Sequence, residues 1–323
     1  MSHNMNEKIL LVGAGRMAIE YAKVLKSLNK PFICVGRSFS SAKKFMELMN
    51  IPAETGGLKK YLKENTSLPS SAIVTVNIEQ LCPVTLTLLE HGVKRILIEK
   101  PGGIDSNEIG KIVRKSEKVN AEVYVAYNRR FYSSTFKAEK IIKNEGGMQS
   151  FHFDFTELSH LISKSNINSV VKKNWLLANS THVIDTAFYF GGEPKYLTCH
   201  TSGSLDWHPT SSIFTGSGIT KENILFSYHA NWNSPGRWGL ELMTEESRLI
   251  LRPMEELYIQ RKDSFEIEKV PISDDLDYKF KPGLFLLVKS FFNSNNDKRL
   301  VTIDEQYRKT TSWYDLIAKG MRE

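Results

Sequence analysis

The first third of the chain alternates short apolar runs with stretches whose apolar residues recur at helical spacing. The apolar runs predict strands at 8–12, 31–38, 71–78, 95–100 and 122–128, and the periodic stretches predict helices at 19–28, 40–50, 84–92 and 107–120. Strands that alternate with helices of this length form βαβ units, which build a parallel sheet with helices on both faces. We therefore expect an α/β fold whose first domain, residues 1–126, is a doubly wound parallel sheet.

The pattern changes from about residue 151. Apolar and polar residues alternate with period two in longer runs, which predict strands at 150–158, 195–204, 222–232, 238–252 and 256–270. Such alternation is typical of a mostly antiparallel sheet with one solvated face. Two helical stretches, at 182–192 and 305–320, complete a second domain that we place at 127–323. Its last helix is a candidate to pack back on the first domain.

The composition is that of a globular enzyme. Of 323 residues, 41% are hydrophobic and 24% charged, and the length suits roughly two domains. No apolar run approaches the roughly 18 residues that would span a bilayer. The apolar run near residue 8 continues into a glycine turn without the cleavage site of a signal peptide. We therefore expect a cytoplasmic protein.

Cysteine usage and charge exclude several other classes. Cys34, Cys82 and Cys199 are far apart and include no CxxC pair, which argues against a disulfide framework and against a metal site. We expect buried free thiols. The net charge is +7, but Lys and Arg are scattered among acidic residues without a nucleic-acid motif. An anionic small ligand explains this excess equally well, so we expect neither a nucleic-acid nor a membrane partner.

The stretch GAGRMA directly after the first strand matches the G-x-G-x-x-G/A dinucleotide fingerprint. Gly13 allows the tight turn, Gly15 lets the backbone approach a pyrophosphate, and Ala18 permits close packing of helix and strand. The pyrophosphate would lie at the helix N-terminus, where free N–H groups and the helix dipole favour an anion. Arg16, Met17 and Asn77 are assigned to the same cofactor site.

The second predicted strand ends without a carboxylate. An Asp or Glu at this point would hold the ribose hydroxyls of NAD, but the chain has Gly36, Arg37 and Ser38. A guanidinium beside a hydroxyl suits the 2′-phosphate of NADP. We therefore expect NADP as the preferred cofactor, with NAD possible. The alternative is that Arg37 stacks on adenine and that the enzyme accepts either cofactor.

The run 95–99 ends at Glu99-Lys100-Pro101, where parallel strands present their carboxyl ends to a ligand. Here the sequence resembles the Gfo/Idh/MocA oxidoreductase family, in which a Glu-Lys-Pro supplies the catalytic lysine. The resemblance covers nearly the whole chain through four motifs in order: GAGRMA at 13–18, IEKP at 98–101, YNRRF at 127–131 and HVIDTAFYFGGEP at 182–194.

The resemblance implies a second α/β domain with a large open sheet, a substrate cleft, and pairing of subunits through that sheet as a homodimer or homotetramer. It also implies hydride transfer between nicotinamide and a carbinol or ketone carbon of a sugar, polyol or sugar nucleotide. Lys100 would exchange a proton with the reacting oxygen, and Glu99 and Lys100 would lie beside the cofactor. The alternative is a catalytically inactive sensor or scaffold that binds dinucleotide.

The resemblance further places several residues on the substrate. His182 corresponds to a histidine that often contacts substrate in the family, and Asp185, one turn later, is expected to pack or orient it. Tyr127, Asn128 and Arg129 would lie near the cleft, although an exposed basic turn is an equal alternative. Where many members carry an Asp four residues before the histidine, this chain has Ala178, with Asn179 and Thr181 as nearby polar substitutes.

The stretch at 228–242 concentrates aromatic and donor side chains around a Pro-Gly turn. Trp232 and Arg237 are assigned to the substrate, although Trp232 and Trp238 could instead cover the sheet. A charged substrate, such as a nucleotide diphosphate sugar or a sugar carboxylate, is expected from Arg129, Arg130, Arg237 and the pair Lys172-Lys173.

Overall fold

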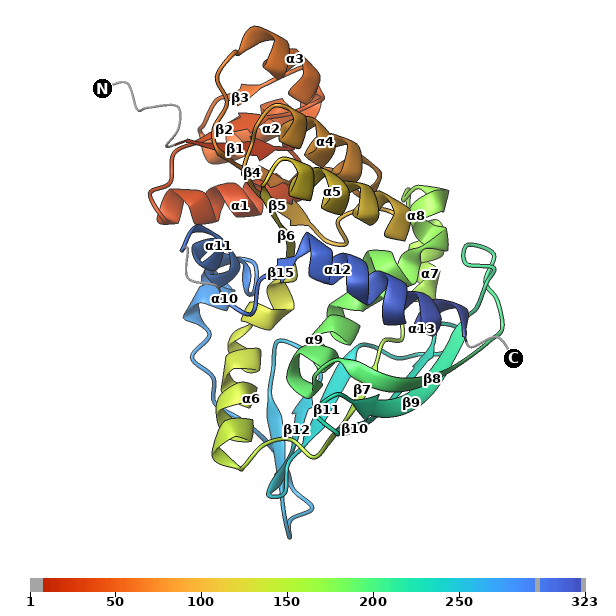
Figure 1. Cartoon of the computed structure of the whole chain (residues 1–323). Helices are drawn as coiled ribbons and strands as arrows, with labels where there is room; N and C mark the ends of the chain where they lie inside the picture. Colours follow the sequence, from red (N-terminus) through yellow and green to blue (C-terminus); the bar gives the residue numbers. More distant parts are fainter. Residues whose placement is uncertain (1–7, 294–296, 321–323) are drawn as a thin grey trace. The chain divides into compact units, whose positions relative to one another are not determined.

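The chain forms two compact units in a computed structural model that describes residues 8–293 and 297–320 (Figure 1). Unit 1 comprises the residues up to Tyr127 together with Lys279–Arg308, and unit 2 comprises Asn128–Tyr278 and the residues from Lys309 on. Residues 279–308 thus belong to unit 1, whereas the sequence division had placed them in the second domain.

Unit 1 contains a sheet with the strand order β15-β6-β5-β4-β1-β2-β3 in its described residues. Strands β1 to β6 are parallel, and β15 pairs antiparallel with β6. The elements are β1 (Ile9–Val12), α1 (Arg16–Ser27), β2 (Phe32–Val35), α2 (Phe39–Met49), β3 (Ala53–Glu54), α3 (Gly57–Glu64), β4 (Ser71–Val74), α4 (Ile78–Glu90), β5 (Arg95–Glu99), α5 (Ser106–Lys118), β6 (Glu122–Ala126), α11 (Leu284–Phe292), β15 (Val301–Thr302) and α12 (Ile303–Lys309).

The strand order explains how helices cover this sheet. From β1 the chain runs outward through β2 and β3, and from β4 it runs outward in the opposite direction through β5 and β6. Right-handed crossovers therefore place α1 and α2 on one face and α4 and α5 on the other. Strands β1, β4 and β5 read as nearly continuous buried runs, as expected for a sheet covered on both faces. The predicted doubly wound sheet is confirmed.

Unit 2 contains a sheet with the strand order β14-β13-β12-β11-β7-β10-β9-β8, and only the β7–β10 pair is parallel in its described residues. Its elements are η2 (Asn128–Phe131), α6 (Ser133–Asn144), β7 (Ser150–Asp154), α7 (Ser159–Lys164), α8 (Ser169–Lys173), η3 (Leu176–Ser180), α9 (Thr181–Gly191), β8 (Pro194–Ser202), β9 (Ile213–Thr220), β10 (Leu225–Asn231), β11 (Gly239–Met243), β12 (Ser247–Leu251), β13 (Tyr258–Arg261), β14 (Ile267–Lys269), η4 (Thr310–Tyr314) and α13 (Asp315–Lys319), with α10 (Asp275–Lys279) at the junction of the units. The predicted large, mostly antiparallel sheet is confirmed.

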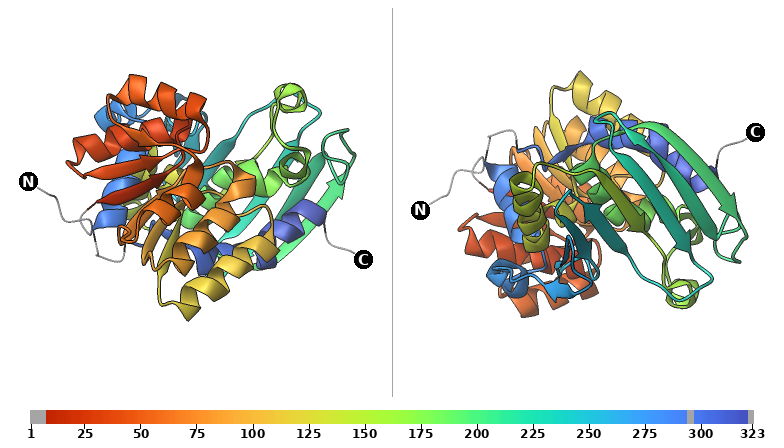
Figure 2. Two further views of the ribbon diagram at one scale, coloured as in Figure 1. Left: turned by 90° about the horizontal axis from the view of Figure 1, so that it is seen from above. Right: turned by 90° about the horizontal axis from the view of Figure 1, so that it is seen from below.

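One face of this sheet carries helices and the other is solvated. Helix α9 packs against β7, and α13 packs against β8 (Figure 1). The right-hand view of Figure 2 looks onto the opposite face, where the strands lie in front of these helices. Strand β10 alternates exposed and buried residues accordingly, with Phe226, Tyr228 and Ala230 buried. The terminal helix α13 therefore covers the sheet of unit 2.

A buried ion cluster joins three residues of unit 2, which come from η2, α9 and the last position of α12. The Asp185 carboxylate on α9 accepts hydrogen bonds from Arg130 Nε at 2.7 Å and Arg130 Nη2 at 2.8 Å. Lys309 Nζ donates to the same carboxylate at 2.9 Å. All three side chains are buried, with 0% to 4% exposure. Asp185 therefore holds Arg130 and Lys309 in place, and Arg130 is a structural residue rather than a contact for an anionic substrate.

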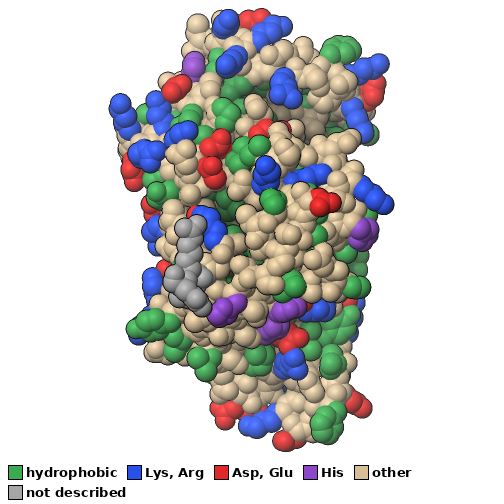
Figure 3. Space-filling view, turned by 90° about the vertical axis from the view of Figure 1, so that its right-hand side faces the viewer, with side chains coloured by type: hydrophobic (Ala, Val, Ile, Leu, Met, Phe, Trp, Pro, Cys, Tyr) green, Lys and Arg blue, Asp and Glu red, His purple; other side chains and the backbone are tan. Residues whose placement is uncertain are grey.

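Three expectations from the composition concern the cysteines, membrane-spanning helices and the distribution of surface charge. Cys34, Cys82 and Cys199 are buried free thiols, as predicted. Within 8–293 and 297–320, no helix is long and apolar enough to cross a membrane. On the face that Figure 3 presents, Lys and Arg are interspersed with acidic side chains rather than gathered in one patch.

Candidate active site

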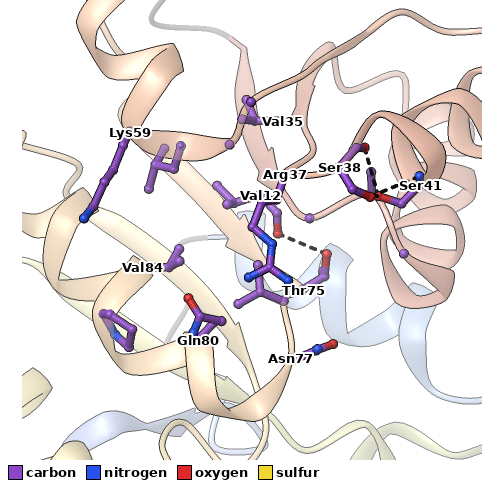
Figure 4. A pocket seen from close by; sticks show the side chains of 18 of the residues that line it. Val12, Val35, Arg37, Ser38, Ser41, Lys59, Thr75, Asn77, Gln80 and Val84 are labelled. Atoms are coloured by element: carbon purple, nitrogen blue, oxygen red, sulfur yellow. Dashed lines mark hydrogen bonds between the residues drawn. The ribbon is translucent and has the colours of Figure 1, made fainter. Parts of the chain in front are cut away.

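A pocket of about 450 Å³ lies in unit 1 between the carboxyl ends of β1, β2 and β4 (Figure 4). This is the point at which the strand order reverses, and open α/β sheets bind ligands at such a switch point. The lining residues are Val12, Gly13, Ala14, Gly15, Val35, Arg37, Ser38, Ser41, Gly56, Gly57, Leu58, Lys59, Thr75, Val76, Asn77, Gln80, Pro83, Val84 and Thr87. This set includes Arg and Lys but no Asp or Glu.

Glycine is needed at positions 13 and 15 of the fingerprint for different physical reasons. Gly13 has φ +116°, and a Cβ there would lie 2.5 Å from Thr75 Oγ1. Its N–H donates to the Val35 carbonyl at 2.9 Å, which holds the turn against the second strand. Gly15 has an ordinary φ of −85°, but a Cβ there would meet no protein atom within 4 Å. A side chain at Gly15 would therefore occupy the pocket itself.

These features fit a dinucleotide phosphate. Helix α1 begins directly after Gly15, so its first N–H groups lack intrahelical partners and its dipole favours an anion. Ala18 is fully buried, consistent with its predicted role in close packing. Arg16 is exposed and Met17 half-buried, and neither lines the pocket.

The end of β2 provides a cluster of donors. Arg37 reaches into the pocket, and Ser38 caps α2 by accepting a hydrogen bond from the Ser41 N–H at 3.3 Å (Figure 4). The hydroxyls of Ser38 and Ser41 are 2.7 Å apart. Lys59, in the first turn of α3, lines the same pocket. Ser41 and Lys59 were not predicted from the sequence, because no local pattern indicated α3 and the expected phosphate site ended at Ser38.

The β4 side of the pocket is fixed by Thr75 and Asn77. Thr75 Oγ1 donates to the Val12 carbonyl at 3.1 Å, which joins the ends of β1 and β4. Asn77 is the N-cap residue of α4 and lines the pocket, where the sequence analysis had placed it. Gln80, one turn into α4, also lines the pocket and was not predicted.

Glu99 and Lys100 lie at the carboxyl end of β5 and do not line this pocket. Glu99 Oε1 accepts a hydrogen bond from the buried Tyr21 hydroxyl at 2.8 Å. Burial raises the pKa of Glu99, and the Tyr21 hydrogen bond and the Lys100 charge oppose that rise. After Lys100, the Pro101 carbonyl accepts a hydrogen bond from Gln306 Nε2 at 3.0 Å, so α12 holds this loop.

Unit 2 gathers a second cluster around the Trp238 indole. The guanidinium of Arg129 lies 4.7 Å from a Trp238 ring centroid and that of Arg237 lies 4.5 Å away, which are cation–π distances. The His182 ring lies 5.9 Å from Trp238. Burial lowers the pKa of Arg129, and Arg129 Nε is buried without a hydrogen-bond partner in the described residues. Three predicted substrate residues, Arg129, His182 and Arg237, therefore surround one indole.

A buried carboxylate that was not predicted from the sequence bonds to this indole. Glu157, which is 2% exposed, follows β7. It accepts hydrogen bonds from Asn179 Nδ2 at 3.1 Å, Ser180 Oγ at 2.8 Å and Trp238 Nε1 at 3.3 Å. Burial raises the pKa of Glu157. Its position, 22 residues before Asn179 in the sequence, gave no local signal of this contact.

Other predicted substrate residues have structural roles. Trp232 is 1% exposed, donates from Nε1 to the Phe155 carbonyl at 3.1 Å and stacks on Trp207, so its assignment to the substrate is corrected: it fills the core. Thr181 donates to the Leu177 carbonyl, and Lys172 donates to the carbonyls of Ser163 and Ser165. Tyr127 and Asn128 are buried where the chain passes from unit 1 to unit 2.

Comparisons with known proteins agree on the fold. An oxidoreductase from Thermotoga maritima is similar with a TM-score of 0.76 and 17% identity over 98% of this chain and 96% of that one. A levoglucosan dehydrogenase in complex with NADH has a TM-score of 0.75 and 16% identity over 97% and 96%. A UDP-N-acetylglucosamine 3-dehydrogenase from Acidithiobacillus ferrooxidans has a TM-score of 0.73 and 12% identity over 96% of both chains.

Comparisons at the level of sequence gave no match, either to a protein-family model or to a curated protein. The chain therefore shares the two-domain fold of these dehydrogenases at low identity, which confirms the fold that the sequence resemblance implied.

Proposed function

We propose that this protein is an NAD(P)-dependent oxidoreductase of the Gfo/Idh/MocA type that acts on a sugar, a polyol or a sugar nucleotide. The observation that carries the proposal is the pocket at the switch point, with Gly13 closing the turn and open space beside Gly15. The dehydrogenases with the same fold support it, because they are named for a sugar nucleotide, UDP-N-acetylglucosamine, and for a sugar derivative, levoglucosan.

In this proposal the bound nicotinamide supplies or accepts a hydride, and the side chains of the protein handle the proton. Lys100 donates to the reacting oxygen when a carbonyl is reduced and accepts the proton when a carbinol is oxidised. Glu99, fixed by Tyr21, sets the position at which β5 ends before Lys100. His182 contacts the substrate hydroxyls, as the sequence resemblance implies.

NADP is the proposed preferred cofactor. The pocket lining offers Arg37 and Lys59 as cations and Ser38 and Ser41 as hydroxyls, and no carboxylate that would bind ribose hydroxyls and repel a 2′-phosphate. Arginine binds phosphate through a planar fork of donors, and charge-assisted bonds of this kind are the strong ones.

The proposed substrate carries a carboxylate or phosphate group. Of the basic residues considered from the sequence, Arg130 bonds to Asp185 and Lys172 bonds to backbone carbonyls. Arg129 and Arg237 both contact the Trp238 ring, and the buried Arg129 Nε lacks a hydrogen-bond partner among the described residues. A buried donor of this kind is costly unless a ligand satisfies it.

The function is tested by turnover of NADPH or NADP with a panel of keto-sugars, neutral sugars, sugar carboxylates and UDP-sugars. We expect turnover with an anionic member of the panel, and Lys100→Ala should lower kcat by roughly 10²- to 10⁴-fold with NADPH affinity retained. Activity of Lys100→Ala within a few fold of wild type would contradict the assignment of the proton-transfer group.

A second candidate function is a dinucleotide-binding sensor or scaffold without catalysis. Ala178, at the position where many members of the resembled family have an Asp, favours it. NADPH binding without turnover of any member of the panel would support this alternative. Binding of neither cofactor would contradict both.

Self-association and location are part of the same proposal. We propose that the helix-free face of the unit 2 sheet pairs with a second copy of the chain, giving a homodimer or homotetramer, and that the protein is cytoplasmic. Sedimentation velocity at low micromolar concentration tests the first, and a monomer would contradict it.

A further inference from the structure

The resembled family often has an aspartate four residues before the substrate histidine, and this chain has Ala178 there. A buried carboxylate, that of Glu157, bonds to the two residues that follow Ala178. Ala178 is 4% exposed and lies in η3, a π-helical turn that leads directly into α9 and His182. Such turns are frequently found at functional sites.

The two polar residues that directly follow Ala178 both bond to Glu157. Asn179 Nδ2 lies 3.1 Å from each carboxylate oxygen of Glu157, and Ser180 Oγ donates to Oε1 at 2.8 Å. The bonds to Asn179 and Ser180 hold the last two residues of η3, which precede His182 by three and two positions. Glu157 thereby fixes the backbone from which the His182 side chain projects.

Glu157 also holds the ring that contacts His182. Trp238 Nε1 donates to Glu157 Oε1 at 3.3 Å, and the Trp238 ring contacts both the His182 imidazole and the two guanidinium groups of Arg129 and Arg237. The Glu157 carboxylate lies 4.0 Å from Arg237 Nη1, although the Arg237 side chain is 52% exposed. One buried carboxylate thus bonds both to η3 and to the aromatic centre of the cluster.

We propose that Glu157 is a positioning residue for the reaction, which orients His182 and Trp238 toward the substrate. This inference rests on the proposed function and deepens it. Three groups donate hydrogen bonds to this buried carboxylate. A glutamine in its place would be costly, because its amide N–H would face donors at a position where only an acceptor fits.

This role can be tested by exchanging the carboxylate of Glu157 with the amide of Asn179. Glu157→Gln removes the charge and sets an amide against the Asn179 amide. Adding Asn179→Asp to Glu157→Gln restores one carboxylate and one amide with their positions exchanged. Glu145→Gln is the matched control, since Glu145 also accepts two hydroxyl hydrogen bonds in unit 2, from Thr244 at 2.7 Å and Ser247 at 2.6 Å, but none from Trp238.

With the panel member that wild type turns over fastest, Glu157→Gln should lower kcat by roughly 10- to 100-fold while its KM and the Kd of NADPH stay within about threefold. The double variant should recover most of that loss, and Glu145→Gln should match wild type. Full activity of Glu157→Gln would overturn the proposal, as would a double variant no better than the single one. A purely structural role would lower the melting temperature and leave kcat per folded molecule unchanged.

A second measurement does not depend on turnover. In ¹⁵N-resolved NMR spectra, assigned with Trp238→Phe and His182→Gln, the Trp238 indole and the His182 imidazole signals should both move in Glu157→Gln, return toward wild type in the double variant and stay in place in Glu145→Gln. An unmoved His182 signal would overturn the proposal. If wild type turns over no member of the panel, the proposed function fails, and these signals alone decide whether Glu157 orients His182.

Discussion

Arg37 and Lys59 come from different elements, the end of β2 and the first turn of α3, yet both line one pocket. No Asp or Glu is among the residues that line this pocket, so a bound phosphate would gain charge-assisted bonds without repulsion from a carboxylate of the lining. We therefore propose that single side chains decide the preference between the two nicotinamide cofactors.

Arg37→Ala should weaken NADPH binding by roughly 10- to 100-fold, the range of one or two hydrogen bonds to a charged group, and leave NADH binding nearly unchanged. Lys59→Ala should act in the same direction with a smaller effect. Calorimetric titration measures both. Lys63→Ala, later in α3 and outside the pocket lining, is the control. An equal loss of NADH and NADPH affinity in Arg37→Ala would favour adenine stacking instead.

Asp185 is decisive for stability at the same scale. Burial alone would raise the pKa of Asp185, but the charges of Arg130 and Lys309 outweigh burial and lower it below the ordinary value of 3.8. A carboxyl with a lowered folded-state pKa stabilises the fold above its unfolded-state pKa, and this stabilisation is lost as the pH falls through the folded-state value.

Asp185→Asn should lower the free energy of unfolding by about 3 to 5 kcal/mol at pH 7, because two buried cations lose their shared carboxylate. The difference from wild type should hold from pH 7 down to the ordinary aspartate value of 3.8 and shrink below it. Urea unfolding across this range measures it. If the difference in unfolding free energy between Asp185→Asn and wild type did not change at pH values below 3.8, the ion-pair explanation would be contradicted.

At the scale of elements, the turn from β1 to α1 uses its two glycines for separate purposes. Gly13→Ala should destabilise the protein, because its Cβ would lie 2.5 Å from Thr75 Oγ1 at a φ of +116°. Gly15→Ala should fold like wild type, since its methyl group meets no protein atom, but should bind NADPH more weakly because the methyl group enters the pocket. Thermal melts measure the stability of both variants, and NADPH titrations measure their cofactor affinity. If the two variants lost stability and affinity equally, the separate roles of the two glycines would be contradicted.

The same scale shows what the sequence could and could not predict. Strands β1, β2, β4, β5 and β6 and the fingerprint followed from hydrophobic runs and one glycine motif. Strand β9 was missed because Gly216 and Gly218 interrupt its alternation, and both are small because the Tyr228 and Phe226 rings of β10 fill the space where their side chains would lie. Helix α3, with its Lys59, begins at the second of two consecutive glycines, Gly56 and Gly57, and is only eight residues long.

At the scale of the whole molecule, local sequence patterns could not predict which elements far apart in the sequence pack together. Helix α11 is strongly apolar, which predicts burial but not its partner, and it packs against α1 at the opposite end of the sequence in unit 1. The hydrogen bond between Trp238 and Glu157 is also a contact between distant segments, because Glu157 follows β7 and Trp238 directly precedes β11. Sequence motifs therefore indicated the glycine loop and His182 as candidates, while the carboxylate of the second cluster required the fold.

The central claim is that the pocket of unit 1 binds a phosphorylated nicotinamide cofactor. Calorimetric titration of the wild-type protein with NADPH and with NADH, in the same buffer, tests it most directly. The pocket chemistry predicts one site per chain and NADPH binding at least about tenfold tighter than NADH, since one charge-assisted hydrogen bond contributes roughly that much. Tighter binding of NADH would contradict the assignment of Arg37 and Lys59, and binding of neither cofactor would contradict the proposed function as a whole.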